Sequence, residues 1–172
     1  SSERAPSAST ARSTDRPRCW SSRWSVARSL GSSSATSTRR AAADTVTGAH
    51  PHLEHSRVNA QMMRSAAASA LADRVQVRDL YALYPDYLID VAAEQRELAA
   101  AQLVVWLQPL HWYGMTPLLK LWLDEGFAFG WAYGPGGQGL SGKDLWLVAS
   151  TGGGEDSYRP QGTNRHFFDA FL

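Results

Sequence analysis

The segment at residues 49–59, AHPHLEHSRVN, contains residue types that could bind a phosphate group. Ser56 and Asn59 stand at and just inside the expected start of a helix, where free backbone N–H groups and the helix dipole favour an anion. His50 could donate a hydrogen bond from the end of a preceding strand, and Arg57 adds positive charge. A simple capped helix with surface histidines would have the same pattern, so the segment alone leaves both interpretations open.

The histidines of this segment raise a second possibility, a metal site. His50, His52 and His55 are close together in the sequence. Their spacing matches no common ligand pattern, and zinc sites rarely take three ligands from one loop. We therefore expect no metal site here.

Two later loops also contain chemically capable residues. Residues 108–117 read QPLHWYGMTP, and the adjacent Trp112 and Tyr113 could pack against a planar ring. Residues 150–162 read STGGGEDSYRPQG. Glycines there would let the backbone approach a ligand closely, and Tyr158, Glu155 or Asp156 could hydrogen-bond a reacting group. Hydrophobic packing at a strand end and a flexible surface loop are the simpler alternatives.

The elements around these loops alternate between helix and strand. Apolar periodicity predicts helices from Ser56, over 91–102, over 117–129 and near His166, and strands at 75–77, 103–107 and 145–149. This alternation indicates an α/β fold with a doubly wound parallel sheet. In such sheets, ligands bind beyond the carboxyl ends of the strands. Because the three loops follow strands at that edge, we expect them to form one site.

Composition narrows the class of protein. The chain has 172 residues and is 44% hydrophobic, enough for one domain with a core. No apolar run approaches the roughly 20 residues of a membrane-spanning helix. Cys19 is the single cysteine, so neither a disulfide within the chain nor a CxxC site is possible. We expect a cytoplasmic protein, with any membrane association peripheral at the inner face of the plasma membrane.

The first 40 residues differ from the rest. They hold thirteen serines and eight arginines but only two acids, whereas the remainder has nine basic and fourteen acidic side chains. The few bulky apolar residues of this segment would bury too little surface to offset the conformational entropy lost on folding. We therefore expect residues 1–42 to be disordered. A transit peptide, a basic arm that binds nucleic acid, and a segment without selected function, such as an out-of-frame start, are the three interpretations; we favour the last.

Two nucleotide-binding strings do not stand in the right context. Residues 134–139 fit GxGxxG, and residues 137–143, GQGLSGK, resemble a P-loop. Both follow a helix and lead into a strand, the reverse of the dinucleotide-binding order. Asp144 occupies the Ser/Thr position of the P-loop, where an acid would repel phosphate. We expect neither string to bind a nucleotide.

Taken together, the segments AHPHLEHSRVN, RDLYALYPDYLIDVAAEQ, LVVWLQPLHWYGMTPLLKLWLDEGFAFGWAYG and GKDLWLVASTGGGE resemble the flavodoxin-like NAD(P)H:quinone oxidoreductases. The similarity covers residues 48–172 and is closest to the ancillary flavoproteins of glutathione-regulated potassium-efflux systems. It implies a flavodoxin-like FMN-binding domain over residues 43–172, with strand order 2-1-3-4. Family members continue beyond the FDAFL segment through a fifth strand and a final helix, so we expect this domain to be truncated at its C-terminus.

The resemblance also implies roles for individual residues. The FMN phosphate would be held by His50, Ser56, Arg57, Val58 and Asn59. The isoalloxazine ring would be lined by Leu110, His111, Trp112 and Tyr113 and wrapped on its other side by Ser150, Thr151, Gly152 and Gly153. Tyr158 stands where related quinone reductases have a catalytic tyrosine. Asn164 occupies the place of their histidine, and His166, two residues later, is the candidate second member of the pair.

The implied activity is transfer of two electrons, as hydride, from NADH or NADPH through FMN to a quinone, by a homodimer. An alternative is a regulatory subunit that docks on and activates a potassium-efflux transporter, with catalysis secondary or lost. We expect no nucleic-acid partner. The strand before His50 departs from the family's aliphatic pattern. Its Asp44, Thr45 and Thr47 would be costly in a doubly covered strand, so we expect a weak first strand and poor FMN binding.

Overall fold

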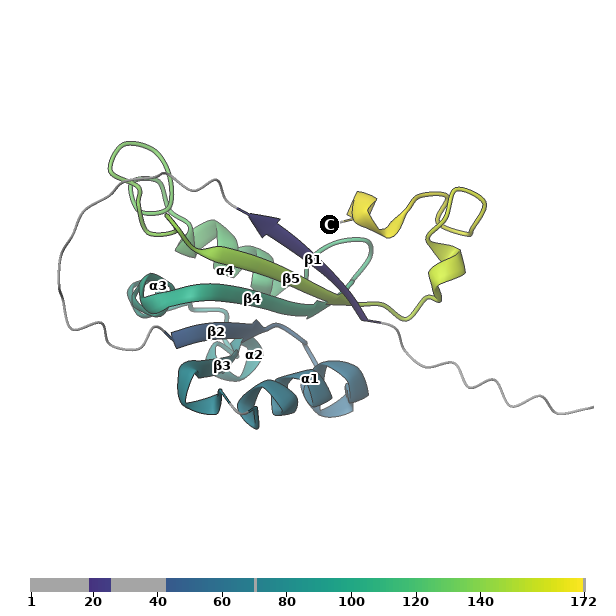
Figure 1. The fold of residues 1–172 in the computed structure, drawn as a ribbon, viewed down its shortest axis with the longest axis horizontal. Coiled ribbons are helices and arrows are strands. Elements are labelled where there is room, and N and C mark those ends of the chain that lie inside the picture. Colours follow the sequence, from purple (N-terminus) through teal and green to yellow (C-terminus); the bar gives the residue numbers. More distant parts are fainter. Residues whose placement is uncertain (1–18, 26–42, 70, 172) are drawn as a thin grey trace, which may run out of the picture.

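The computed structural model describes residues 19–25, 43–69 and 71–171, and its centre is a five-stranded sheet in the order β1-β5-β4-β2-β3 (Figure 1). Four strands are parallel: β2 (Ala43–Gly48), β3 (Val75–Asp79), β4 (Ala101–Pro109) and β5 (Asp144–Ser150). Counted from β2, the parallel strands have the order 2-1-3-4, which confirms the predicted doubly wound arrangement.

The strand β1 (Cys19–Ser25) was not predicted. It lies within the segment expected to be disordered and pairs antiparallel with β5, from Cys19 opposite Ser150 to Ser25 opposite Asp144. Strand pairing uses backbone N–H and C=O groups, so a segment of almost any composition can add to an unpaired sheet edge. Residues 1–18 and 26–42 lie outside the described residues, and for them disorder stays a prediction.

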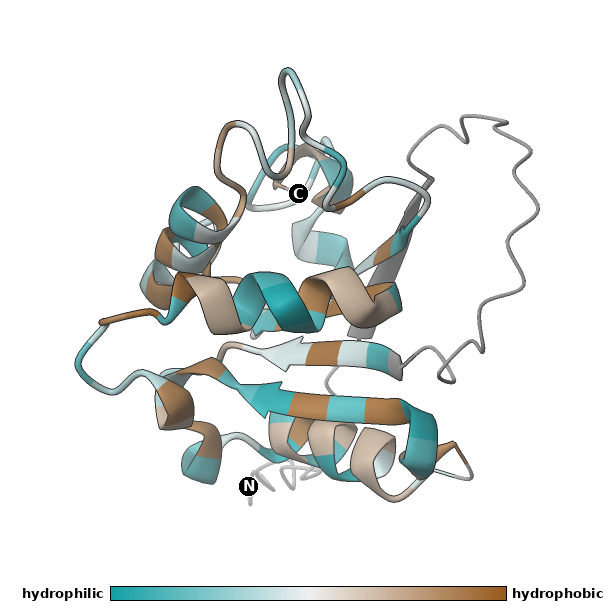
Figure 2. Cartoon of the chain, turned by 90° about the vertical axis from the view of Figure 1, so that its left-hand side faces the viewer, coloured by the Kyte–Doolittle hydropathy of each residue, from teal (hydrophilic) through white to brown (hydrophobic). Residues whose placement is uncertain are grey.

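Helices cover both faces of the sheet. Helix α1 (Arg57–Ala67) packs on one face, where Met63 contacts Val46 and Leu107 in a hydrophobic cluster. On the other face lie α2 (Leu80–Leu83), α3 (Val91–Ala100) and α4 (Pro117–Gly126), which bury Leu80, Leu98 and Trp122 against Val104 and Trp106 of β4. Valines alternate with polar residues along β3, as its sequence predicts (Figure 2).

Local sequence explains where the main helices begin. Ser56 caps α1, with Oγ accepting from the Asn59 N–H at 3.1 Å, and Asp90 caps α3 through the Ala93 N–H at 2.9 Å. Pro117 stands in the first turn of α4, where its missing N–H is not needed. The expected helix over 91–102 ends at Ala100, because the two residues that follow join β4.

The segment after β5 has no long helix. The prediction of a helix near His166 is wrong. The described part of this segment contains only two short 3-10 turns, η3 (Glu155–Ser157) and η4 (Phe168–Phe171). The single buried anchor in η4 is Phe168, which packs against Tyr158 and Ala149. Phe171 packs only partly buried against the same cluster, and two contacts from one turn are too few to hold several turns of helix, because short helices depend on tertiary packing.

The central strand β2 forms despite its polar composition. Thr45 and Thr47 are fully buried, and Thr47 Oγ1 has no hydrogen-bond partner among the described residues. Such a group costs about 1–3 kcal/mol. β2 therefore forms at the position that the fold requires, and its buried polar side chains lower the stability of the folded state, as the sequence indicates. None of the helices in the described ranges has the length and hydrophobicity needed to cross a membrane.

Candidate functional site

The three loops identified from the sequence meet at the carboxyl edge of the parallel strands. The loop after β4 joins the end of β5 through a bond from the Leu110 N–H to the Ser150 carbonyl oxygen, at 2.7 Å. The start of α1 reaches the same point, since Asn59 Nδ2 donates to Ser150 Oγ at 2.9 Å. The rings of His50 and His111 meet edge to face with centroids 6.5 Å apart. Each loop thus contacts the other two.

The α1 loop ends in a buried and incompletely paired asparagine. Asn59 is 3% exposed, and its Nδ2 donates to Ser56 Oγ and Ser150 Oγ, whereas its Oδ1 has no partner among the described residues. Gly48 allows α1 to lie this close to the sheet, because a Cβ there would be 2.4 Å from Met63 Sδ. A buried acceptor without a donor is costly, so Asn59 is poised to accept a hydrogen bond from a ligand.

His50, between β2 and η1 (Leu53–His55), is a neutral donor. Burial, with smaller contributions from the imidazoles of His111 and His52, lowers the pKa of His50 below its usual range. Its Nδ1 accepts from the His52 N–H at 3.0 Å. A neutral imidazole that accepts at Nδ1 has its proton on Nε2. His50 can therefore donate from Nε2 to an anion or a hydroxyl.

The loop after β4 contains a strained two-residue turn. The N–H and C=O groups of His111 bond reciprocally with those of Gly114, at 3.1 and 3.0 Å, and enclose Trp112 and Tyr113. Both enclosed residues have positive φ, 46° and 64°, a conformation that such turns normally assign to Asn and Gly. The left-handed region costs about 1–2 kcal/mol for each bulky residue. Trp112 is also 96% exposed, so its own burial does not offset this cost.

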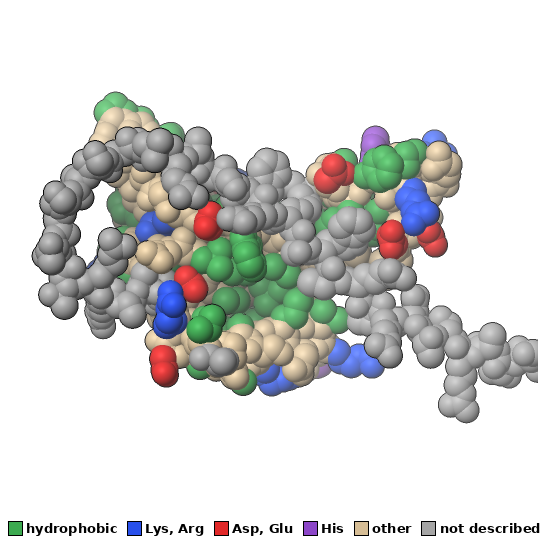
Figure 3. All heavy atoms as spheres, in the orientation of Figure 1, with side chains coloured by type: hydrophobic (Ala, Val, Ile, Leu, Met, Phe, Trp, Pro, Cys, Tyr) green, Lys and Arg blue, Asp and Glu red, His purple; other side chains and the backbone are tan. Residues whose placement is uncertain are grey.

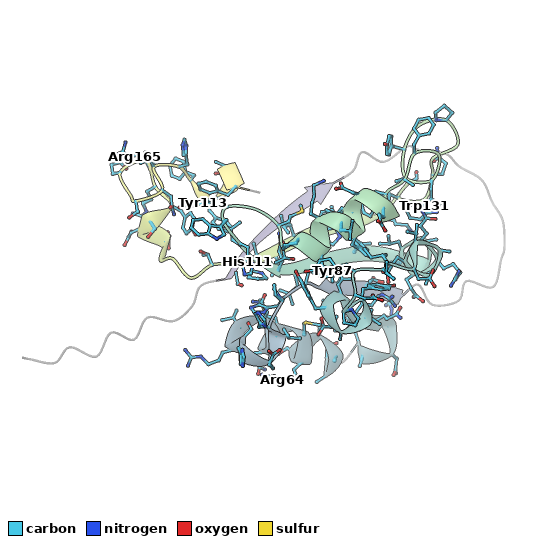
Figure 4. All side chains as sticks on the ribbon, turned by 180° about the vertical axis from the view of Figure 1, so that it is seen from behind. Arg64, Tyr87, His111, Tyr113, Trp131 and Arg165 are labelled. Carbon is cyan, nitrogen blue, oxygen red and sulfur yellow. The ribbon has the colours of Figure 1, made fainter. Side chains whose placement is uncertain are left out.

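The loop after β5 places a tyrosine beside that turn. Tyr158 is buried against Phe168, with ring centroids 5.0 Å apart, and its hydroxyl pairs with Thr151 Oγ1. Thr151 Oγ1 also accepts from the Gly153 N–H at 3.2 Å, which fixes the glycine segment. The two loops are joined by a bond from the Tyr113 hydroxyl to Asn164 Oδ1, at 2.8 Å, and Tyr113 points toward the segment after β5 (Figure 4).

Between these two loops is an open pocket of about 350 Å³. Its lining combines aromatic rings, hydroxyl groups and glycine backbone: Leu110, Trp112, Tyr113, Thr151, Gly152, Gly153, Ser157, Tyr158, Thr163 and Asn164. The predicted phosphate-binding residues do not line this pocket. They adjoin it through the bond between Asn59 and Ser150, and Ser150 precedes Thr151 in the chain.

The structure separates the two candidate catalytic residues. Tyr158 lines the pocket, whereas His166 is exposed and its ring lies against Phe171, with centroids 6.2 Å apart. The Tyr158 hydroxyl is paired with Thr151, and Asn164 rather than His166 lines the pocket. Of the two positions considered from the sequence, the structure therefore brings Asn164 to the site.

Two lining residues, Ser157 and Thr163, were not identified from the sequence. The Asn164 N–H bonds to the Ser157 carbonyl oxygen at 2.9 Å, which folds the loop back on itself. No local pattern in the sequence signals this closure. On the same segment, Arg159 pairs with Glu155 and Asp156 at 3.2 and 3.4 Å, and charges of both signs gather there (Figure 3, right).

The P-loop-like string has a structural use. Lys143 Nζ donates to the carbonyl oxygens of Ala99 and Ala101, at 2.9 and 2.6 Å, and so caps the end of α3. Partial burial lowers the pKa of Lys143. The string connects α4 to β5 and leads into a strand, and the absence of nucleotide binding stays a prediction.

Comparison with known families identifies the fold. The family described as "flavodoxin-like fold" matches residues 46–172. The chain belongs to this flavodoxin-like family. Glutathione-regulated potassium-efflux system ancillary protein KefF of Citrobacter koseri is 51% identical over 110 residues, which are 64% of this chain and 61% of that protein. The chain thus spans about three fifths of the length of this curated relative.

Two solved structures have a fold similar to that of this chain. General stress protein 14 from Treponema denticola, in complex with FMN, is 37% identical, covers 76% of this chain and 74% of its own, and superposes with a TM-score of 0.69. NADPH-quinone reductase from P. pentosaceus is 24% identical with a TM-score of 0.65, covering 75% of this chain and 71% of its own, which shows the shared fold.

Proposed function

We propose that this flavodoxin-like chain binds FMN and catalyses electron transfer from NAD(P)H to a quinone. The observation that carries the proposal is the strained turn at Trp112 and Tyr113, which presents two aromatic rings beside the glycine loop Ser150–Gly153. Strain of this kind persists in folded proteins chiefly where function requires it. The FMN complex of the Treponema denticola protein and the quinone reductase fold of the P. pentosaceus protein support the assignment.

The residues present fit FMN at both of its ends. A phosphate has donors at the free N–H groups of Arg57 and Val58 in the first turn of α1 and at His50 Nε2. The unpaired Asn59 Oδ1 suits a hydroxyl of the ribityl chain. The ring would lie between the turn residues Leu110, His111, Trp112 and Tyr113 and the loop residues Ser150, Thr151, Gly152 and Gly153.

FMN, when bound, supplies the two-electron chemistry that links a nicotinamide to a quinone. The protein side chains would bind and orient the reacting molecules and exclude water from them. Thr151 holds the Tyr158 hydroxyl at the pocket wall, where it can hydrogen-bond a quinone oxygen. Asn164, held by Tyr113, offers an amide on the same segment after β5. We propose Tyr158 as the polar contact to substrate, with His166 outside the pocket.

The direct test is to add FMN to the purified chain and follow NADH and NADPH oxidation with a soluble quinone. We expect a yellow complex that oxidises at least one of the two nucleotides. A protein that remains colourless and inactive would contradict the proposal.

A second candidate function follows from the potassium-efflux relatives, whose name describes an ancillary protein. In this proposal the chain docks on a membrane transporter and activates it, and flavin is dispensable. Gly152 offers a clean discrimination, because an added Cβ meets nothing within 4 Å and the fold should tolerate a larger residue. Gly152→Phe should abolish oxidoreductase activity but leave transporter activation intact. Loss of both would exclude simple docking.

We also propose that the protein is a homodimer. Large apolar side chains stand exposed at Trp112, Phe129 and Tyr133, which are 96%, 69% and 60% exposed. The rings of Phe129 and Tyr133 contact each other, with centroids 5.7 Å apart, and an exposed apolar patch favours a protein contact. Sedimentation velocity of the purified chain should give twice the monomer mass, and a monomer at high concentration would contradict this assignment.

A further inference from the structure

Three metal-ligand side chains gather on the short turn η1, outside the pocket. His52, Glu54 and His55 each offer one ligand atom, and these atoms lie within 4.8 Å of one another. Glu54 Oε1 is 3.8 Å from His52 Nδ1 and 3.6 Å from His55 Nδ1. The set differs from the three histidines considered in the sequence, because a carboxylate replaces His50.

These separations are close to those of a zinc site. Zinc binds imidazole nitrogen and carboxylate oxygen at about 2.0–2.2 Å in a tetrahedron, which places neighbouring ligand atoms about 3.4 Å apart. The two distances to Glu54 exceed this by a few tenths of an ångström. The side chains of His52, Glu54 and His55 are 74%, 65% and 80% exposed. The ligand atoms of His52 and His55 lie within 4.8 Å of each other, and rotation of these exposed side chains can bring all three atoms to zinc distance.

The backbone that carries these ligands is held in place. The N–H groups of His55 and Ser56 bond to the carbonyl oxygens of His52 and Leu53, both at 3.0 Å, and so close the turn. Leu53 packs inward against the hydrophobic cluster that contains Met63. The side chains next to Leu53 in the chain therefore point outward.

His50 is excluded from the set for a structural reason. Its Nδ1 accepts from the His52 N–H at 3.0 Å, so that nitrogen is not free to bind a metal. The same bond fixes the backbone of His52, the first ligand. The spacing of the histidines alone does not reveal this, because the hydrogen bond depends on the local chain direction.

We propose that His52, Glu54 and His55 bind a zinc-class divalent cation, with water in the remaining coordination position. Two imidazoles and one carboxylate are a ligand set that zinc uses with an open fourth position, and imidazole favours zinc, copper and nickel over magnesium and calcium. The zinc ion would exchange bound waters for these three ligands without exposing any buried group of the protein. Three ligands on one turn are unusual for zinc, and the hydrogen-bonded closure of η1 brings them together here. We expect micromolar affinity and little change in global stability.

The test uses the full chain without flavin, so its result does not depend on the proposed redox function. Zinc is titrated against a chromogenic chelator at pH 7.5, and cobalt is added separately to read tetrahedral coordination from its visible absorption. We expect one zinc per chain. His52→Ala/His55→Ala should weaken binding by at least about tenfold, and Glu54→Gln should weaken it less, consistent with loss of inner ligands.

Matched variants separate this site from other zinc-binding residues of the chain. His166→Ala, Cys19→Ser and Glu125→Gln should leave zinc affinity unchanged, and circular dichroism should show that every variant is folded. The absence of stoichiometric zinc binding by the wild-type chain would overturn the proposal. So would retention of full affinity by the double histidine variant.

Discussion

Two polar clusters on this sheet differ at their centres: both oxygens of a buried carboxylate are paired in one, and the oxygen of a buried amide is unpaired in the other. One surrounds Glu94 in the interior, between β3 and helices α2, α3 and α4. The other is the loop edge that includes Asn59, Ser150 and the Trp112–Tyr113 turn. The first is closed to solvent, and only Arg78 Nε lacks a hydrogen-bond partner there among the described residues, whereas the second combines an unpaired amide oxygen with a strained turn.

The interior cluster pairs both oxygens of one buried carboxylate. Glu94 is 1% exposed, its Oε1 accepts from Arg78 and the Tyr84 hydroxyl, and its Oε2 accepts from Trp122 Nε1 at 2.9 Å. Burial and the neighbouring Glu94 raise the pKa of Tyr84 to about 12. These bonds join α3, which carries Glu94, to strand β3, the end of α2 and helix α4.

The loop edge has the opposite character. Asn59 Oδ1 is buried without a partner, and two bulky residues hold positive φ in one turn. An orphaned buried acceptor and a strained turn that lie together on loops at the carboxyl edge of the sheet favour a site that is completed by a ligand. The contrast therefore predicts that variants of the interior cluster change stability, and variants of the loop edge change binding.

The largest expected effect is at Glu94. Glu94→Ala leaves Arg78 as a buried charge without its partner, which costs about 3–5 kcal/mol of unfolding free energy. Urea denaturation followed by circular dichroism measures this loss. Glu125→Ala, at an exposed position of α4, is the matched control and should change stability by less than about 0.5 kcal/mol. Equal losses of stability in the two variants would contradict a stabilising role for the Glu94 cluster.

A smaller effect of opposite sign is expected in the strained turn. Trp112→Asn places a residue that tolerates positive φ where Trp112 buries almost nothing, so stability should rise by about 1 kcal/mol. FMN affinity should fall in the same variant because the aromatic ring is lost. Trp112→Ala is the control: it should lose FMN affinity without the gain in stability. A stability loss in Trp112→Asn would show that the turn is not strained.

The smallest effect concerns the pH dependence of stability. Because the pKa of His50 is lowered in the folded state, the unfolded chain binds more protons below about pH 6.5, and stability falls on acidification. His50→Gln should reduce the stability difference between pH 7 and pH 5.5. Denaturation curves at the two pH values give the comparison. An unchanged difference in His50→Gln would contradict the burial of this imidazole.

The sequence predicts the elements of this fold better than their contacts. Ser56 marks the start of α1 and the run at 103–107 marks β4, because capping and apolar periodicity act locally. The pairing of β1 with β5 and the bond between Asn59 and Ser150, 91 residues apart, depend on the assembled sheet.

The same limit applies within the candidate site. The types of Trp112 and Tyr113 suggest an aromatic surface, but their positive φ values are set by the reciprocal bonds of His111 and Gly114. The exclusion of His50 from the metal-ligand set likewise follows from one backbone hydrogen bond. Residue types therefore indicated the chemistry, and the fold decided which atoms remain available for it.

The central claim is that the loop edge binds FMN, and a titration of the purified chain with FMN, followed by quenching of flavin fluorescence, tests it most directly. We expect one FMN per chain, loss of binding in Gly152→Phe, and retention in Gly154→Phe. Gly154 is the matched control because its added Cβ is equally unhindered and it does not line the pocket. Failure of the wild-type chain to bind FMN, or equal loss of FMN binding in both variants, would contradict an FMN site at the loop edge.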